Sequence, residues 1–158
     1  MFDLAPEMMR FSKFMLDSVR RNFIEGGRPT PWQALKMGGP SALFAGGDLV
    51  RSITSASGDS WAEVSTSGLP YARIHQEGGE THPTITQKSK GFFWWKFKET
   101  GLPMWKALAL KYAVGEKMTV NIPARPYMMF QDEDIETIKS ELQDHIVNFY
   151  NSQGEQIG

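Results

Sequence analysis

The sequence contains no cysteine among its 158 residues. This absence excludes a disulfide framework, a thiolate metal site and a cysteine nucleophile. No apolar run approaches the roughly 18 residues that are needed to span a bilayer. Met1-Phe2-Asp3-Leu4 has no basic residues ahead of an apolar stretch, so we expect no Sec signal. These absences predict a soluble chain that is held together by packing alone.

An excess of charge of either sign is also missing. The chain has 17 basic and 18 acidic residues, with a formal charge of −1 and a pI near 6.3. A global field that attracts nucleic acid or an anionic membrane is therefore not expected. Hydrophobic residues make up 41% and charged residues 22%, which is typical of a globular chain of one domain.

Apolar residues recur at steps of three and four near both ends of the chain, and this spacing predicts two helices. The first is expected over residues 3–23, with Asp3 as its N-cap and Gly26-Gly27 as its end. The second follows Asp132-Glu133-Asp134, whose carboxylates suit a helix N-terminus. Further elements are predicted from shorter patterns: helices over 30–36, 43–53 and 69–77, a hairpin of 52–56 with 61–66, a loop over 78–90 and a strand over 117–122.

Helices thus come before and after a group of strands, and this order predicts an α+β fold. We expect a small antiparallel sheet, formed by the hairpin and the later strand, that is packed by the N-terminal and C-terminal helices. Residues 1–150 are expected to form one domain that includes a basic aromatic segment at about 80–116. Residues 151–158 are expected to be a flexible tail.

The densest polar cluster contains His75, Glu77, Glu80 and His82, whose side chains are suitable metal ligands. A metalloprotease pair, however, needs two histidines one helical turn apart, and here seven positions and two glycines separate them. The alternative is a hydrogen-bonded His75 and a solvated His82. No cofactor is therefore expected, and the four residues are kept as metal candidates only.

Catalytic signatures are missing as well. The chain has no Gly-x-Ser-x-Gly elbow, and its glycine pairs have neither the phosphate-loop lysine nor the dinucleotide fingerprint. The sequence therefore predicts no catalytic residues and a protein that is not an enzyme.

Residues 88–111 combine six lysines and one glutamate with six aromatic residues. Such a mixture could stack bases and neutralise phosphates, as in a nucleic-acid-contacting module. The alternation of Phe93, Trp95 and Phe97 is instead typical of a buried strand face, followed by a helix with Met104 and Leu108 on one side. A core or a protein interface is the preferred interpretation.

The charge reverses after Gln131, where seven carboxylates face one lysine. This segregation could reflect contacts within the chain or a solvated helix face. It would also allow the basic side of one subunit to meet the acidic side of the next in a head-to-tail ring.

Several strings stand in a fixed order along most of the chain, from about residue 4 to 148. They are Glu25-Gly26-Gly27-Arg28-Pro29, Gly47-Asp48-Leu49-Val50-Arg51-Ser52-Ile53, Tyr71-Ala72-Arg73-Ile74-His75-Gln76-Glu77-Gly78-Gly79 and Ile122-Pro123-Ala124-Arg125-Pro126-Tyr127. Together they resemble the phage virion morphogenesis family, the tail-completion or neck proteins of Mu-like and P2-like phages and prophages. The family often has a threonine where this chain has Gly46.

The resemblance implies a structural protein of the tail-completion or head-tail joining type, which assembles as a homo-oligomeric ring without a catalytic step. Six subunits would match the symmetry of the tail. Its partners would be other tail or head-connector proteins, and it would reside in the virion after assembly in the host cytoplasm. The alternative is a nucleic-acid-contacting module that uses residues 88–111.

Two of the strings also have a physical reading. Pro126 forces Arg125 into an extended conformation, ready for a carboxylate within or between subunits, or simply as part of a stiff elbow. Tyr71 can bury its ring while its hydroxyl stays hydrogen-bonded, and core packing is the preferred role. The candidate interface residues are Arg125, Tyr71, Trp94, Lys96, Lys98, Asp132 and Asp134.

Overall fold

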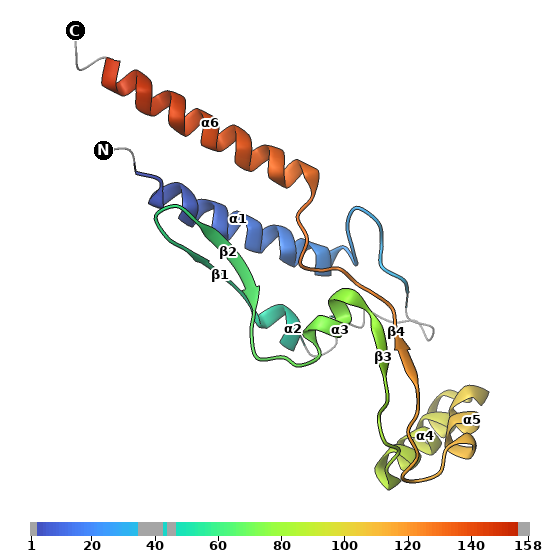
Figure 1. The fold of residues 1–158 in the computed structure, drawn as a ribbon. Coiled ribbons are helices and arrows are strands. Elements are labelled where there is room, and N and C mark those ends of the chain that lie inside the picture. The colour runs from blue at the N-terminus through green and yellow to red at the C-terminus, as the bar shows by residue number, and fades with distance from the viewer. Residues whose placement is uncertain (1–2, 35–42, 44–46, 155–158) are drawn as a thin grey trace. The chain divides into compact units, whose positions relative to one another are not determined.

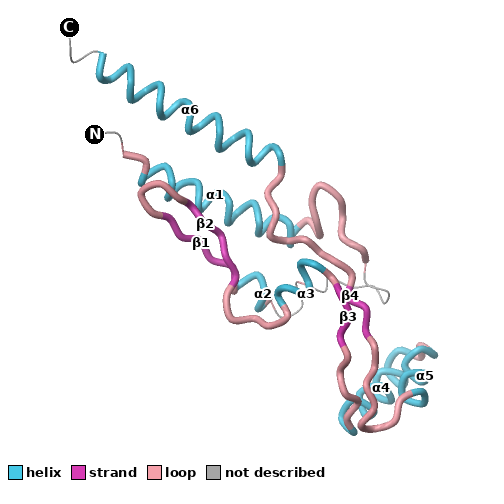
Figure 2. Tube along the Cα trace, viewed as in Figure 1, coloured by secondary structure: helices cyan, strands magenta, loops and turns pink. Residues whose placement is uncertain are grey.

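A computed structural model of the chain describes residues 3–34, 43 and 47–154, and it has the expected α+β composition (Figures 1 and 2). Its contacts form two compact units, where the sequence predicted one domain. Unit 1 comprises Met1–Glu77 and Ala124–Gly158, and unit 2 comprises Gly78–Pro123. The elements, in order, are α1 (Ala5–Ile24), α2 (Asp48–Arg51), β1 (Ile53–Ser57), β2 (Ala62–Thr66), α3 (Ala72–Glu77), β3 (Gly79–Thr81), α4 (Gln87–Thr100), α5 (Pro103–Lys111), β4 (Val120–Ile122) and α6 (Asp132–Gly154).

Helix α1 forms as predicted. Its N-cap, however, is Leu4 and has no side-chain cap, where the sequence predicted Asp3; the Asp3 carboxylate accepts a hydrogen bond from the Ala5 amide at 3.0 Å. The helix ends before Gly26 and Gly27, both of which have positive φ. A Cβ on Gly27 would lie 2.6 Å from the ring of Trp32, so glycine is required there for packing as well as for conformation.

The core of unit 1 lies along α1. The predicted hairpin pairs β1 with β2, from Ile53 opposite Thr66 to Ser57 opposite Ala62, and it packs against α1 (Figure 1). Helix α6 runs antiparallel beside α1. The buried core residues are Val19, Phe23, Leu43, Leu49, Ile53, Ala72 and Tyr127.

Two predicted helices of unit 1 are wrong in the part that the structure describes. Residues 30–34 are not helical, because the Trp32 amide donates to the Gly26 carbonyl at 2.7 Å and its ring meets the edge of Phe23. Residues 35 and 36 lie outside the described residues. Of the helix expected over 43–53, residues 44–46 lie outside the described residues; in the described part the helix is limited to α2, which begins after Gly47 at a φ of 71°, and Ile53 already belongs to β1.

Unit 2 contains the largest departure from the expected structure. Residues 78–90 are not a loop throughout, since β3 pairs with β4 and Gln87 opens α4. The strand expected around Phe93 is also wrong, because α4 continues through Thr100. Thr86 and Ser89 form a reciprocal capping box that starts this helix.

The other elements of unit 2 agree with the sequence. Helix α5 lies where the pattern placed it, and β4 forms within the strand expected over 117–122, although it pairs with β3 in a second sheet and not with the hairpin. Ile85, Phe93 and Ala109 form a small core. In unit 1, α3 occupies the second part of the predicted helix over 69–77, and α6 forms after Gln131. Residues 151–154 belong to α6, whereas we expected the flexible tail to begin at residue 151. No helix in the described part of the chain is long and apolar enough to cross a membrane.

Candidate functional site

The structure does not bring the four metal candidates together. His75 and Glu77 lie in α3 of unit 1, whereas Glu80 and His82 lie in unit 2. Glu77 pairs with Arg73 at 2.9 Å. His82 lies 3.3 Å from the hydroxyl of Thr119. Among residues 3–34, 43 and 47–154, no three ligating side chains are placed to hold a metal ion.

His75 belongs to the packing around α3. Its Nδ1 atom is buried without a hydrogen-bond partner among the described residues, and its ring meets the edge of Tyr71 with centroids 5.8 Å apart. Burial, followed by the positive charge of Arg125, lowers the pKa of His75 below its ordinary value of 6.5. This side chain therefore favours the neutral state in the folded protein.

The depressed pKa predicts a pH dependence of stability. The unfolded chain binds a proton at His75 more readily than the folded chain does. The contribution of His75 to the free energy of unfolding is therefore fully present above pH 6.5 and is lost progressively as the pH falls below 6.5. His75→Gln should flatten this loss between pH 7.5 and 5.5 in urea unfolding. His82→Gln is the control, since His82 is exposed, and it should keep the wild-type profile. Equal profiles for the wild type and His75→Gln would contradict the assignment.

A buried polar network joins α1 to the segment that leads into α6. The Arg28 guanidinium donates to the Asn22 side chain at 2.9 Å and to the Ser18 carbonyl and hydroxyl at 2.8 and 2.7 Å. The Ser18 hydroxyl in turn donates to Asp134, whose other bond comes from the Gln131 amide at 2.9 Å. Arg28 itself lies 3.8 Å from the Asp134 carboxylate. The charges of Arg28 and Asp134 therefore have partners within the chain.

Two further side chains fix the backbone of the same segment. Asn22 donates to the carbonyls of Tyr127 and Met129 at 2.8 and 2.9 Å. Gln76 accepts the amides of Tyr127 and Met128, both at 2.9 Å. Burial raises the pKa of Tyr127, and its hydroxyl donates to the Ala72 carbonyl at 3.1 Å. The point at which α6 begins is thereby held against α1 and α3.

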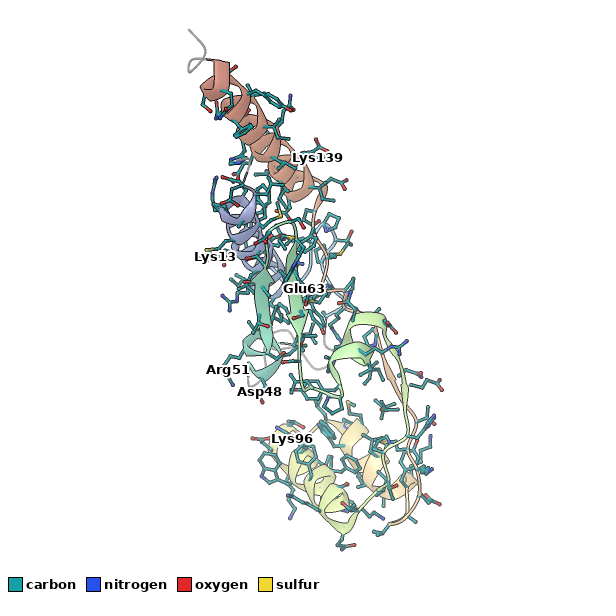
Figure 3. The ribbon with its side chains drawn as sticks, turned by 60° about the vertical axis from the view of Figure 1, so that its left-hand side comes forward. Lys13, Asp48, Arg51, Glu63, Lys96 and Lys139 are labelled. Atoms are coloured by element: carbon teal, nitrogen blue, oxygen red, sulfur yellow. The ribbon has the colours of Figure 1, made fainter. Side chains whose placement is uncertain are left out.

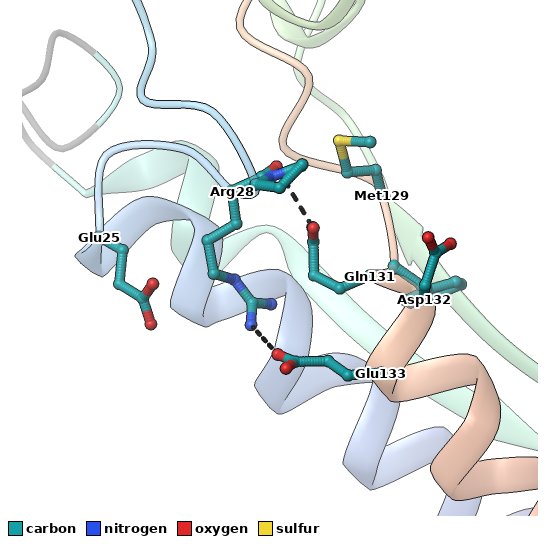
Figure 4. Close-up of a pocket in the computed structure, with 8 residues that line it drawn as sticks. Glu25, Arg28, Met129, Gln131, Asp132 and Glu133 are labelled. Atoms are coloured by element: carbon teal, nitrogen blue, oxygen red, sulfur yellow. Dashed lines mark hydrogen bonds and ion pairs between the residues drawn. The ribbon is translucent and has the colours of Figure 1, made fainter.

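An open cavity of about 610 Å³ borders this network (Figure 4). Figure 4 shows the Gln131 side chain reaching the Arg28 carbonyl, a bond of 3.2 Å, and Arg28 facing Glu133 at 3.5 Å. Asp132 lines the same cavity and is exposed. Among the candidate interface residues, Asp132 is thus at the surface, whereas Asp134 is 2% exposed.

The other two candidates in unit 1 also differ in accessibility. Arg125 is 5% exposed, its amide donates to the His75 carbonyl at 2.8 Å, and its guanidinium donates to the Gln33 carbonyl at 3.3 Å. These bonds within the chain fix the extended segment before Tyr127. Tyr71 is 39% exposed, so the preferred role in core packing is wrong and the side chain lies at the surface.

In unit 2, Trp94, Lys96 and Lys98 all lie on α4. Lys96, labelled in Figure 3, lies over the ring of Trp95 at 4.6 Å and pairs with Glu99 at 2.6 Å. Trp94 meets Phe97, with ring centroids 6.2 Å apart. Because Phe93 is the buried residue of this helix, most of its aromatic side chains remain at least partly accessible.

Helix α6 also leaves apolar side chains exposed. It contacts α1 through the pairs Glu141 with Arg10 and His145 with Glu7, at 3.1 and 3.3 Å. Exposed apolar residues remain elsewhere on α6: Ile135, Ile146, Val147 and Tyr150. Lys139 is exposed as well (Figure 3).

Sequence reasoning missed the polar network as a unit. A signal for part of it was present, because Ser18 and Asn22 stand one turn apart beside Val19 on the apolar side of α1. Polar residues at core positions need buried partners. Arg28 follows them closely in the chain, but their other partners, Asp134 and the backbone of Tyr127 and Met129, come from a distant segment that spacing could not identify.

Comparisons with known proteins agree over nearly the whole chain. The model of the phage virion morphogenesis family matches residues 1–147. The chain is 30% identical over 141 residues to the Mu-like prophage FluMu G protein 2 of Haemophilus influenzae, an alignment that covers 89% of this chain and 77% of that protein. No solved structure matches.

Proposed function

Because the chain belongs to the phage virion morphogenesis family, we propose that it completes the tail or joins the head to the tail, and that it works by assembling into a ring. A structural role in a phage or prophage is supported by the family and by the Mu-like prophage relative. In this proposal the chain is not an enzyme and acts through binding alone.

The observation that carries the proposal is that two helices, the lysine-rich α4 and the carboxylate-rich α6, both expose large apolar side chains. Helix α4 exposes Phe92, Trp94 and Trp95, and α6 exposes Ile135 and Tyr150. Large exposed apolar side chains that gather on one element mark interaction sites more often than single scattered ones do. Such surfaces suit a protein whose role is fulfilled by docking.

The partners in this proposal are further copies of the chain together with other tail or head-connector proteins. A ring of six subunits would match the symmetry of a tail. The protein would then reside at the neck of the particle, at the head-proximal end of the tail.

Deletion of the gene from its phage or prophage tests the proposal. We expect particles that stall as separate heads and tails in electron micrographs, and recovery of joined particles when the wild-type chain is supplied from a plasmid. Mass spectrometry of purified wild-type particles should detect the chain. Normal infectious particles after the deletion would contradict the proposal.

A nucleic-acid-contacting module is the second candidate, because exposed tryptophans and lysines share α4. If it is right, binding to a single-stranded oligonucleotide should fall steeply with salt and be lost in Trp94→Ala and Lys96→Ala. Binding that is absent, or unchanged in both variants, would remove this candidate.

A further inference from the structure

One side of α4 combines exposed aromatic rings with lysines. Lys88, Gly91, Phe92, Trp95 and Lys98 are spaced by three, one, three and three residues, and this spacing places them on one side of the helix. We call this set the α4 surface. Phe92 and Trp95 are 45% and 53% exposed, and their ring centroids are 5.8 Å apart.

Gly91 lies in the middle of this surface. Nothing in the described part of the chain requires a glycine at this position. It is helical, and a Cβ placed on it would meet no atom within 4 Å. Glycine within a helix is less stable than alanine, so its presence here costs stability. Close approach by the backbone of another molecule is a physical reason for a missing side chain at this position.

One side of α6 has the complementary character. Ile135, Ile146 and Tyr150 fall within an arc of about 60° at 3.6 residues per turn, and they are 41%, 37% and 70% exposed. We call these three residues, together with Asp132 and Glu136 at their edge, the α6 surface. Lys139 lies within the same arc, and Glu136 neutralises it at 2.7 Å.

The charges of the two elements are opposite. Unit 2 has seven lysines and three glutamates, whereas α6 has six carboxylates and one lysine. Two different apolar surfaces of opposite charge on the same chain suit a heterologous contact, in which each copy uses one surface toward each neighbour. Charge complementarity then fixes which surfaces meet.

We infer that the α4 surface of one copy docks on the α6 surface of the next. The inference rests on the proposed function and specifies its subunit contact. Phe92 and Trp95 pack against Ile135 of the neighbouring copy, which lies between Asp132 and Glu136 in the first turns of α6. The lysines at the edge of the α4 surface face the carboxylates at the edge of the α6 surface, and Gly91 admits the neighbouring helix.

Two charge-reversed full-length chains test this contact. The first carries Lys88→Glu and Lys98→Glu, and the second carries Asp132→Lys and Glu136→Lys. Each alone should show self-association at least about tenfold weaker than the wild type in sedimentation experiments, because its two surfaces then repel. An equimolar mixture should recover association, since the reversed surfaces attract each other and so do the two unchanged ones.

The mixture also separates a contact between copies from a contact within one chain. If the two surfaces met within one chain, a single chain with all four changes would recover the self-association of the wild type, whereas the mixture of the two variants would not. That result would overturn the inference. It would equally be overturned by a wild-type chain that stays monomeric, or by variants that associate like the wild type. Detection of a monomeric chain in purified particles would support the structural role while overturning this contact.

Two further variants complete the test: a matched charge control, and a substitution that is expected to stabilise the fold, so that weaker association cannot be caused by misfolding. Lys90→Glu with Lys106→Glu makes the same change of net charge on the Phe97 side of the helical pair and should leave association within about twofold of the wild type. Gly91→Ala should raise the thermal midpoint and yet weaken association by about tenfold. Undiminished association of Gly91→Ala would contradict close approach at this position.

Discussion

Replacing Arg28 with methionine is expected to lower the free energy of unfolding of unit 1 by about 3 kcal/mol. The guanidinium is 9% exposed and makes hydrogen bonds to Ser18 and Asn22. Methionine fills similar volume but donates no hydrogen bond, so Asp134 would remain buried at 2% exposure without its cation. Urea unfolding followed by hydrogen exchange of the α1 amides measures the loss in unit 1 alone.

The control for this change is an exposed arginine near the end of α1. Arg21→Met removes an arginine that is half-exposed and 4.0 Å from Glu133, so it should cost less than about 1 kcal/mol. Adding Asp134→Asn to Arg28→Met should recover part of the stability, because the uncompensated charge is then removed. A loss for Arg28→Met no larger than that for Arg21→Met would contradict a structural role for the network.

The network links stability to the surfaces proposed for assembly. It holds the chain at Gln131, where α6 begins, through Arg28 and Asp134. Beyond this anchor, α6 contacts α1 through pairs such as Arg10 with Glu141. The direction in which α6 presents Ile135 and Tyr150 is therefore determined by buried polar contacts near its first turn. Arg28→Met should consequently weaken self-association as well as folding.

Long amphipathic elements could be predicted from the sequence because their burial follows a single period. Helix α1 buries Met8, Phe11, Val19 and Phe23 against one core, and this stripe is visible in the sequence. The hairpin β1–β2 was likewise identifiable from the turn that contains Gly58 and Asp59. Local pattern and tertiary packing agree in these elements.

Helix α4 was not predictable in the same way. Its aromatic residues occur on all sides, since only Phe93 among its residues is buried, and the pattern around it imitates the alternation of a strand. The decisive local signal was the Thr86 and Ser89 capping box, which has serine in place of the usual glutamate or glutamine. Most aromatic side chains of α4 are not buried in its own core, so their spacing does not follow the helical period by which buried residues are recognised.

The candidate interface residues divide for a related reason. Sequence alone could not tell which of Asp132, Glu133 and Asp134 turns inward. The structure buries Asp134 because Ser18 and Arg28 come from another segment to meet it. The charges that remain at the surface, such as Asp132, are those for which the fold provides no buried partner among the described residues. Spacing identifies a charged segment, but tertiary contacts select its exposed members.

Phe23→Ala is expected to have the largest effect on folding, a loss of about 3–5 kcal/mol. The Phe23 ring is 2% exposed, and its centroid lies 5.1 Å from that of Tyr127 and 5.8 Å from that of Trp32. Alanine would leave a cavity between the end of α1 and the segment that leads into α6, so the free energy of unfolding of unit 1 should fall in urea titrations. Ile24→Ala is the matched control, because the neighbouring Ile24 is 73% exposed and should change the same free energy by less than about 0.5 kcal/mol. Similar losses in the two variants would mean that the core is not centred on Phe23.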